Sequence, residues 1–289
     1  MGIKYSISLL FALATMNLAA ELQVVYPSPQ SSSDTRFNDL IEILTTALEK
    51  TEASHGPFTL QPSEFVMREG RQLTELSAGR RLNVVWSSTS HDKERELLPI
   101  RIPLRKGILG YRVALIHKDN QSKIDQIKTL NDLRLSRLGQ GTGWGDVHIY
   151  EHNGIPVTTT SYDALFKMVD ANRLDLFPRG INEVFAEHAI RHDDNPNLVV
   201  EKNLLIYYPW PYYFFFNKDN EVLKERIESG IRTMMADGSF DEIFWRFNGN
   251  FIQQANTAQR RVITIENHLM PELTPVKDQQ LWFDPLEPK

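Results

Sequence analysis

Hydrophobic residues recur along this chain in two alternating patterns. Short apolar or β-branched runs such as Leu22–Tyr26, Leu82–Trp86 and Val157–Thr160 predict strands. Between such runs, apolar residues follow helical spacing, as in Phe37–Leu48 and in Leu223–Met235. Alternating strands and helices are typical of α/β proteins built on parallel sheets.

The alternation stops and starts again, which predicts two structural units. Gly110–His117 begins the second series of strands and helices, and the aromatic-rich segment Leu204–Phe216 ends it. Two prolines and a short length exclude a membrane span for that segment, so we expect buried strands that cross between units. We therefore expect lobe 1 to comprise residues 21–109 and 210–258, lobe 2 residues 110–209, and a C-terminal tail, residues 259–289, to pack on both.

The first twenty residues differ from the rest. Lys4 precedes an apolar stretch, Ile7–Met16, and Leu18-Ala19-Ala20 offers a small-residue cleavage site. This pattern predicts a signal peptide, residues 1–20, and therefore export to the periplasm. N-myristoylation at Gly2 is the formal alternative.

The composition excludes several kinds of site and partner. The 289 residues include no cysteine, which excludes disulfides, thiolate metal sites and cysteine nucleophiles. A formal net charge of −5 gives no footprint for nucleic acid, and we expect no direct membrane insertion of the mature chain.

The segment Asn83–Arg95 combines groups suited to recognising an anion. The predicted strand runs into hydroxyl residues that include Ser88 and Ser90, and Arg95 follows after a short loop. A guanidinium offers planar bidentate donors to a carboxylate. The alternative for Arg95 is a surface ion pair with Asp92 or Glu96.

A glycine-rich turn, Leu138–Asp146, precedes a predicted helix. Gly141, Thr142 and Gly143 would let backbone N–H groups approach an anion, beside the indole of Trp144. The alternative is a tight turn in which the glycines only relieve steric crowding.

Five segments, in order, resemble family 3 periplasmic solute-binding proteins, the receptors of amino-acid ABC importers. They are Asn83–Arg95, Leu130–Leu133, Leu138–Asp146, Tyr162–Asp175 and Phe215–Asp241. The resemblance covers residues 22–250. It implies an α/β, two-lobed, type II periplasmic-binding fold, with the second lobe inserted in the first and joined to it by two crossover strands.

The resemblance also implies a function and a site. We expect a monomeric receptor, without enzymatic activity, cofactor or metal, that captures a small anionic or carboxylate-bearing ligand by hinge closure and presents it to an ABC permease. The expected ligand-binding residues are Ser88, Ser90, Arg95, Gly141, Thr142, Gly143, Trp144 and Arg179, with Tyr26 and Trp86 as walls.

One departure from the family pattern affects the ligand. Gly180 stands where an acidic residue would pair with the ammonium group of an amino acid, and Arg179 precedes it. An α-amino acid would lose this partner, whereas a second guanidinium in the cleft would favour an anionic ligand. Arg179 has the alternative of pairing with Glu183 or facing solvent.

Other functions remain as alternatives. A ligand-sensing module for a membrane signalling partner would have the same sequence features. A periplasmic dehydratase on this fold would need a general acid, for which Glu64 is the candidate, and a protein with a changed site is a third possibility. His188 and His192 lie one helical turn apart, but the sequence around them lacks a zinc-binding pattern.

Overall fold

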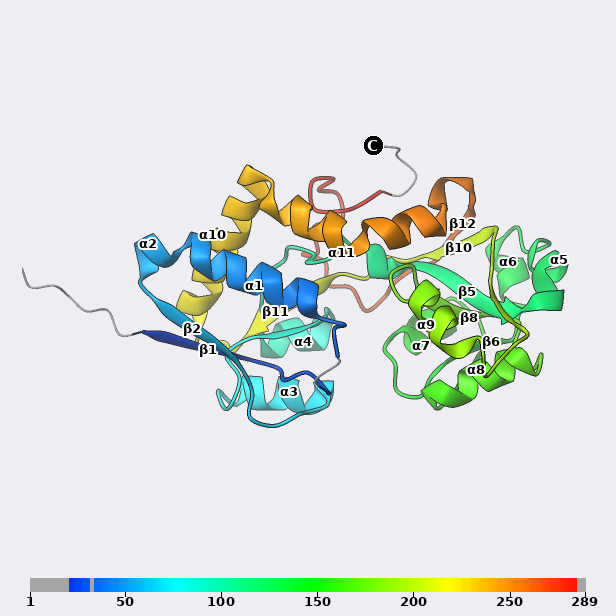
Figure 1. Cartoon of the computed structure of the whole chain (residues 1–289), viewed down its shortest axis with the longest axis horizontal. Coiled ribbons are helices and arrows are strands. Elements are labelled where there is room, and N and C mark those ends of the chain that lie inside the picture. The colour runs from blue at the N-terminus through cyan, green and yellow to red at the C-terminus, as the bar shows by residue number, and fades with distance from the viewer. Residues whose placement is uncertain (1–20, 32–33, 285–289) are drawn as a thin grey trace, which may run out of the picture.

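The computed structural model describes residues 21–31 and 34–284. The expected signal peptide, residues 1–20, therefore lies outside the described residues. Figure 1 shows two lobes side by side, joined by strands in the middle of the molecule and by a long helix, α11, above them. The two-lobed α/β fold expected from the sequence is confirmed.

Lobe 1 is formed by two segments that lie before and after lobe 2 in the chain. Its elements are β1 (Leu22–Tyr26), α1 (Asn38–Lys50), α2 (Glu52–His55), β2 (Phe58–Pro62), α3 (Glu69–Ser77), β3 (Val85–Ser88), α4 (His91–Glu96), β4 (Leu98–Pro99), β11 (Tyr212–Phe216) and α10 (Glu221–Asp237). β1 pairs with β2 in parallel, and β11 lies between β3 and β4 with antiparallel pairing to both.

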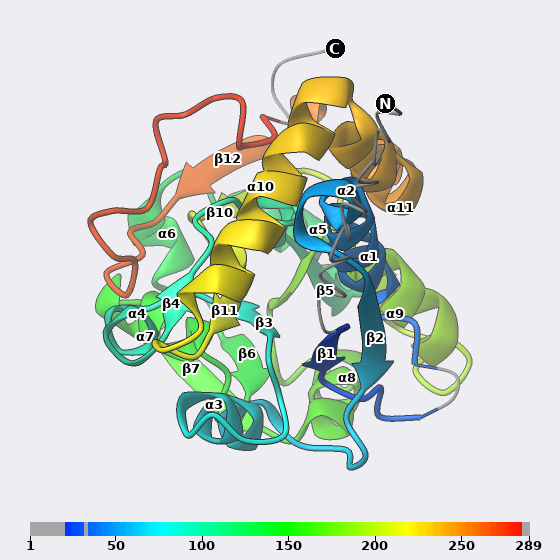
Figure 2. The same cartoon turned by 90° about the vertical axis from the view of Figure 1, so that its left-hand side faces the viewer.

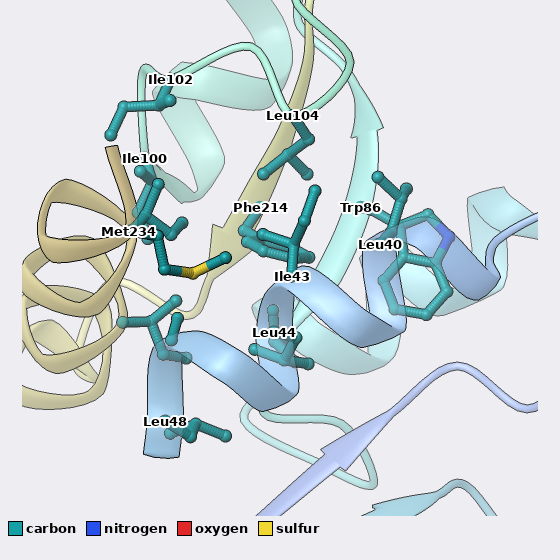
Figure 3. Close-up of a cluster of buried hydrophobic side chains, with 14 of the residues drawn as sticks. Leu40, Ile43, Leu44, Leu48, Trp86, Ile100, Ile102, Leu104, Phe214 and Met234 are labelled. Atoms are coloured by element: carbon teal, nitrogen blue, oxygen red, sulfur yellow. The ribbon is translucent and has the colours of Figure 1, made fainter. Parts of the chain in front are cut away.

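The core of lobe 1 forms where α1 and α10 pack on the β3–β11–β4 sheet. The apolar stripe of α1 is completely buried, because its leucines recur on one face of the helix. Figure 3 shows this stripe against side chains from both sheet and helix, among them Trp86, Phe214 and Met234. Each large apolar side chain buried in this way contributes about 1.5–3 kcal/mol.

Lobe 2 is continuous in sequence. Its elements are η1 (Ile108–Gly110), β5 (Tyr111–His117), η2 (Lys118–Asn120), α5 (Gln121–Ile124), α6 (Leu130–Leu133), β6 (Leu138–Gly141), α7 (Asp146–His152), β7 (Val157–Thr160), α8 (Tyr162–Asp170), β8 (Phe177–Gly180), α9 (Val184–Arg191), β9 (Leu198–Val200) and β10 (Leu204–Tyr207). In its main sheet β10, β5 and β8 are neighbours, with antiparallel pairing of β5 to both, and β6 pairs with β7 in parallel.

The chain after α10 connects the lobes again. α11 (Ser239–Ala255) inserts Phe240 and Ile243 into the core of lobe 1, whereas Phe244 packs in the core of lobe 2. After η3 (Thr257–Gln259), β12 (Arg261–Thr264) adds to the lobe 2 sheet by parallel pairing with β10. Residues 239–258, expected in lobe 1, thus contribute side chains to the cores of both lobes, and residues 261–264, expected in the tail, form a strand of the lobe 2 sheet.

Candidate functional site

The lobe 1 side of the candidate site forms where β3 ends and α4 begins. Ser90 caps α4, since its hydroxyl accepts a hydrogen bond from the backbone N–H of Lys93 at 3.3 Å. This start position turns the Lys93 side chain back toward the strand. Its ammonium group donates to the hydroxyl of Ser87 at 2.6 Å and to the carbonyl oxygen of Ser88 at 2.8 Å, and Glu69 lies 3.2 Å away.

Arg95 lies away from the serines. Its side chain is 66% exposed, and its guanidinium pairs with Asp92 at 2.8 Å and Glu96 at 3.5 Å. Successive helical residues are rotated by about 100°, so Arg95 points to the side of α4 nearly opposite Lys93. The cation beside the serines is therefore Lys93, 22% exposed, which the sequence analysis did not consider.

Aromatic rings line lobe 1 next to this group. The rings of Tyr26 and Phe37 lie 6.0 Å and 5.5 Å from that of Trp86. Trp86 itself is buried in the core, whereas Tyr26 is half-buried. Arg105, buried behind Phe37, forms a bidentate ion pair with Asp39. Tyr26 is thus the more accessible of the two expected wall residues.

The glycine-rich turn of lobe 2 has a steric explanation at its first position. A Cβ atom on Gly141 would lie 2.2 Å from the indole of Trp144, so only glycine lets that ring pack against the turn. The N–H of Thr142 donates to the carbonyl oxygen of Thr160 at 2.9 Å and is not available to a ligand. The side chain of Thr142 and the backbone of Gly143 are exposed.

Arg179 is buried on β8 and fully paired. It donates two hydrogen bonds to Glu187, at 2.6 Å and 2.7 Å, and lies 3.3 Å from Glu183. Burial alone would lower the pKa of Arg179, but Glu183 and Glu187 raise it above the usual value. Arg179 therefore holds a charge that neighbouring carboxylates already neutralise. The pairing alternative is what the structure contains, and the expected second guanidinium for an anionic ligand is not free.

The side chain of Glu183 places a carboxylate beside Gly180, the position at which the family pattern has an acidic residue. It accepts a hydrogen bond from the backbone N–H of Gly180 at 2.9 Å, and a Cβ atom at position 180 would lie 3.0 Å from its carboxylate. The carboxylate thus occupies the space beside Gly180 where a side chain would project. The sequence signal was an acidic residue three positions after the expected one, at the start of α9.

Glu183 remains charged and accessible. Burial would raise its pKa, but Arg179, Arg112 and the Gly180 N–H together lower it below the usual value. Its side chain is 32% exposed, and Arg112 lies 3.5 Å away. Arg112 also approaches Asp146 at 3.6 Å. Five charged residues of lobe 2, two arginines and three acids including Glu187, therefore meet at this end of the sheet.

Charged groups of one lobe influence the pKa values of titratable groups in the other lobe. Arg105 of lobe 1 contributes to the lowered pKa of Glu183 in lobe 2. Glu183 in turn contributes to the raised pKa of Tyr212, which lies on β11 of lobe 1. Glu183 therefore interacts electrostatically with groups of lobe 1.

The remaining candidate residues are not part of this charged cluster. Glu64, the candidate general acid, is exposed on the loop after β2. His188 binds the carbonyl oxygen of Leu198 with its ring nitrogen, 3.0 Å away. Among residues 21–31 and 34–284, no group of three or more histidine, cysteine or acidic side chains is placed to hold a metal ion.

Comparison with solved structures identifies the class of fold. An amino acid ABC transporter substrate-binding protein from Streptococcus pneumoniae, bound to L-arginine, is 15% identical with a TM-score of 0.52, covering 79% of this chain and 94% of its own. An ancestral amino-acid-binding protein described as a precursor of cyclohexadienyl dehydratase is 16% identical with a TM-score of 0.51, covering 78% and 94%. A histidine kinase sensor domain with similarity to periplasmic binding proteins is 16% identical with a TM-score of 0.51, covering 80% and 97%.

The chain therefore has the two-lobed fold of type II periplasmic binding proteins. No protein-family model and no curated protein matches the sequence. Within the described part of the chain, no helix has both the length and the apolar character needed to cross a membrane.

Proposed function

We propose that this protein is a periplasmic solute-binding receptor that captures a small ligand between its lobes and presents it to a membrane partner. The observation that carries the proposal is the presence of a charged group just after a strand on each lobe, Lys93 with its serines after β3 on lobe 1 and Glu183 after β8 on lobe 2. In this fold, closure about the connecting strands would bring such groups onto a ligand from both sides.

The charges favour a ligand with groups of both signs. Lys93 and the exposed part of Ser88 suit a carboxylate or another small anion. Glu183 is ionised and 32% exposed, so in this proposal its accessible part accepts an ammonium or guanidinium group while it remains paired with Arg179 and Arg112. We therefore propose an amino-acid-like ligand in place of the purely anionic ligand inferred from Gly180 and Arg179.

The membrane partner in this proposal is an ABC permease, and the receptor acts as a monomer without catalysing a reaction. A sensory role is the second candidate, supported by the similarity of the fold to a histidine kinase sensor domain. A dehydratase role is less well supported, because Glu64, the candidate general acid, is exposed on the loop after β2.

A thermal-shift screen of residues 21–289 tests the proposal. The panel contains amino acids, polyamines, dicarboxylates and small aromatic acids. A ligand at a hundred times its dissociation constant adds about 2.7 kcal/mol of stability. We expect a hit among the amino-group-bearing compounds that is weakened by Glu183→Gln but not by Glu225→Gln, a change of an exposed acid on α10.

The other results are equally informative. A hit among dicarboxylates that is insensitive to Glu183→Gln would contradict the proposed ligand class. Conversion of a bound compound, followed by mass spectrometry, would instead support an enzyme. A screen without any hit would contradict small-molecule capture and favour a protein partner.

A further inference from the structure

Residues 265–284 of the C-terminal tail bind to both segments that connect the two lobes. Asn267 donates to the carbonyl oxygen of Pro209, in the second connection, at 2.8 Å. At the other end of the tail, the N–H of Phe283 donates to the carbonyl oxygen of Lys106, in the first connection, at 2.9 Å. Figure 2 shows the tail as a red loop beside β12. Relative movement of the lobes must therefore move or release this tail.

The lobe 2 anchor of the tail is a reciprocal pair of hydrogen bonds at the end of α7. The Asn153 side chain donates to the carbonyl oxygen of Glu266 at 2.7 Å and accepts from its N–H at 3.0 Å. Asn153 is buried, so these bonds form only while the tail is docked.

Two histidines stack directly beside the anchor. The rings of His152, at the end of α7, and His268, in the tail, have centroids 4.1 Å apart and planes inclined by 18°. The Nδ1 atom of His268 is buried and has no hydrogen-bond partner among the described residues. A neutral pair of imidazoles packs well in this way, whereas two imidazolium rings would repel each other.

The charged surroundings of His268 come from three elements. His148 and His152 approach from α7, His91 from the start of α4 in lobe 1, and Glu266 from the tail. Glu266 lies 3.6 Å from the Nε2 atom of His152. Three of these four neighbours become positive on protonation, and only Glu266 opposes them.

We propose that the stacked pair His152–His268 is a proton-sensitive latch that holds the tail across the connecting segments and releases it in acid. This inference does not depend on the proposed ligand, because it concerns the docking of the tail alone. Release would free the two connections, and therefore the relative motion of the lobes, at low pH.

The direction of the effect follows from the pKa of His268. Partial burial, followed by the neighbouring His152, lowers this pKa below the usual value of 6.5. The docked tail then binds a proton less readily than the free tail. Docking is fully favoured above about pH 6.5 and weakens as the pH falls below it.

Hydrogen–deuterium exchange of residues 21–289, measured by mass spectrometry at pH 7.5 and 5.5 and corrected for intrinsic exchange rates, tests the latch. We expect peptides from the tail and from both connecting segments to exchange severalfold faster at pH 5.5. Peptides from α1 should not change, which separates release of the tail from global unfolding.

Matched variants identify the titrating group. His268→Phe keeps a flat ring in the stack but cannot bind a proton, so the pH dependence of tail exchange should disappear, and His152→Phe provides a second test. His55→Gln, a change of an exposed histidine on α2, should leave the pH dependence of tail exchange unchanged. A tail whose exchange is independent of pH, or one whose dependence survives both phenylalanine variants, would overturn the proposal.

Discussion

The guanidinium of Arg179 lies 4.6 Å from the centre of the Trp144 ring system, over an indole that packs against Gly141. The arginine predicted to bind a ligand and the tryptophan predicted to line the site therefore stabilise one another. Their contact fixes the glycine-rich turn to the end of β8, and it leaves Glu183 as the accessible charged group.

Replacing Gly141 by alanine should destabilise the protein. The added Cβ would lie 2.2 Å from the Trp144 ring, and such overpacking costs about 1–3 kcal/mol. Gly70→Ala is the matched control, since nothing lies within 4 Å of a Cβ there and alanine is the better helix former. Urea unfolding should show lower stability for the first variant and unchanged or slightly higher stability for the second. Equal stabilities would show that the turn adapts.

The Arg179–Glu187 pair should show strong coupling in a double-mutant cycle. Arg179→Met should cost about 3–5 kcal/mol, because it leaves buried carboxylate charge without its main partner. Adding Glu187→Gln should recover part of this loss, with a coupling of about 0.5–3 kcal/mol. Denaturant unfolding of the original protein, the two single variants and the double variant measures this coupling free energy. Strictly additive losses would mean that Glu183 alone compensates Arg179.

Lys93, and not Arg95, should determine ligand affinity. Lys93→Met removes the ammonium group beside Ser87 and Ser88, whereas Arg95→Met changes an exposed ion pair worth at most about 1 kcal/mol. Calorimetric titration with a ligand found by screening should show weaker binding only for the lysine variant, by a factor of about ten or more for a charge-assisted hydrogen bond. The opposite ranking would restore the interpretation based on sequence.

Asp175 should make the protein sensitive to acid. Burial would raise its pKa, but hydrogen bonds from Arg137 and Lys123 lower it to about 2, against a usual value of 3.8. This lowered pKa contributes about 2 kcal/mol above pH 4, which is lost as the pH falls from about 4 to 2.

Unfolding measurements between pH 7 and 2 check this effect. Asp175→Asn should be less stable than the original protein at pH 7, with a difference that shrinks in acid. Asp163→Asn, at an exposed ion pair with Arg191, should change stability by less than about 1 kcal/mol at either pH. A difference for Asp175→Asn that does not vary with pH would contradict the prediction.

Many elements could be predicted because their residues encode them locally. β1 begins and ends where the sequence pattern placed it, and α1 differs by a residue or two. The sequence pattern also predicts strands over Leu82–Trp86 and Leu174–Phe177, and the structure places both strands two to three residues later. Both strands continue into polar residues, Ser87–Ser88 and Arg179–Gly180, which neighbouring strands pair. Apolar periodicity does not record that pairing.

Other parts were not predicted from local pattern. The sequence pattern also predicts one helix near Ile124–Leu133, where the structure has two short helices, α5 and α6, separated by a turn. α11 was missed, although Phe240, Ile243, Phe244 and Phe247 follow helical spacing, because its apolar residues are divided between the cores of two lobes. The role of Lys93 depended on where α4 begins, which the Ser90 cap determines.

The sequence by itself determined most of the strands and helices, the α/β class and the position of the glycine-rich turn, because each depends on residues close together in the chain. Tertiary structure alone decided which charges are free. The pairing of Arg105 with Asp39, the access of Glu183 and the stacking of His152 on His268 join residues from distant segments. Electrostatic and packing energies depend on distances in space, and those distances exist only once the lobes, their connections and the tail have packed together.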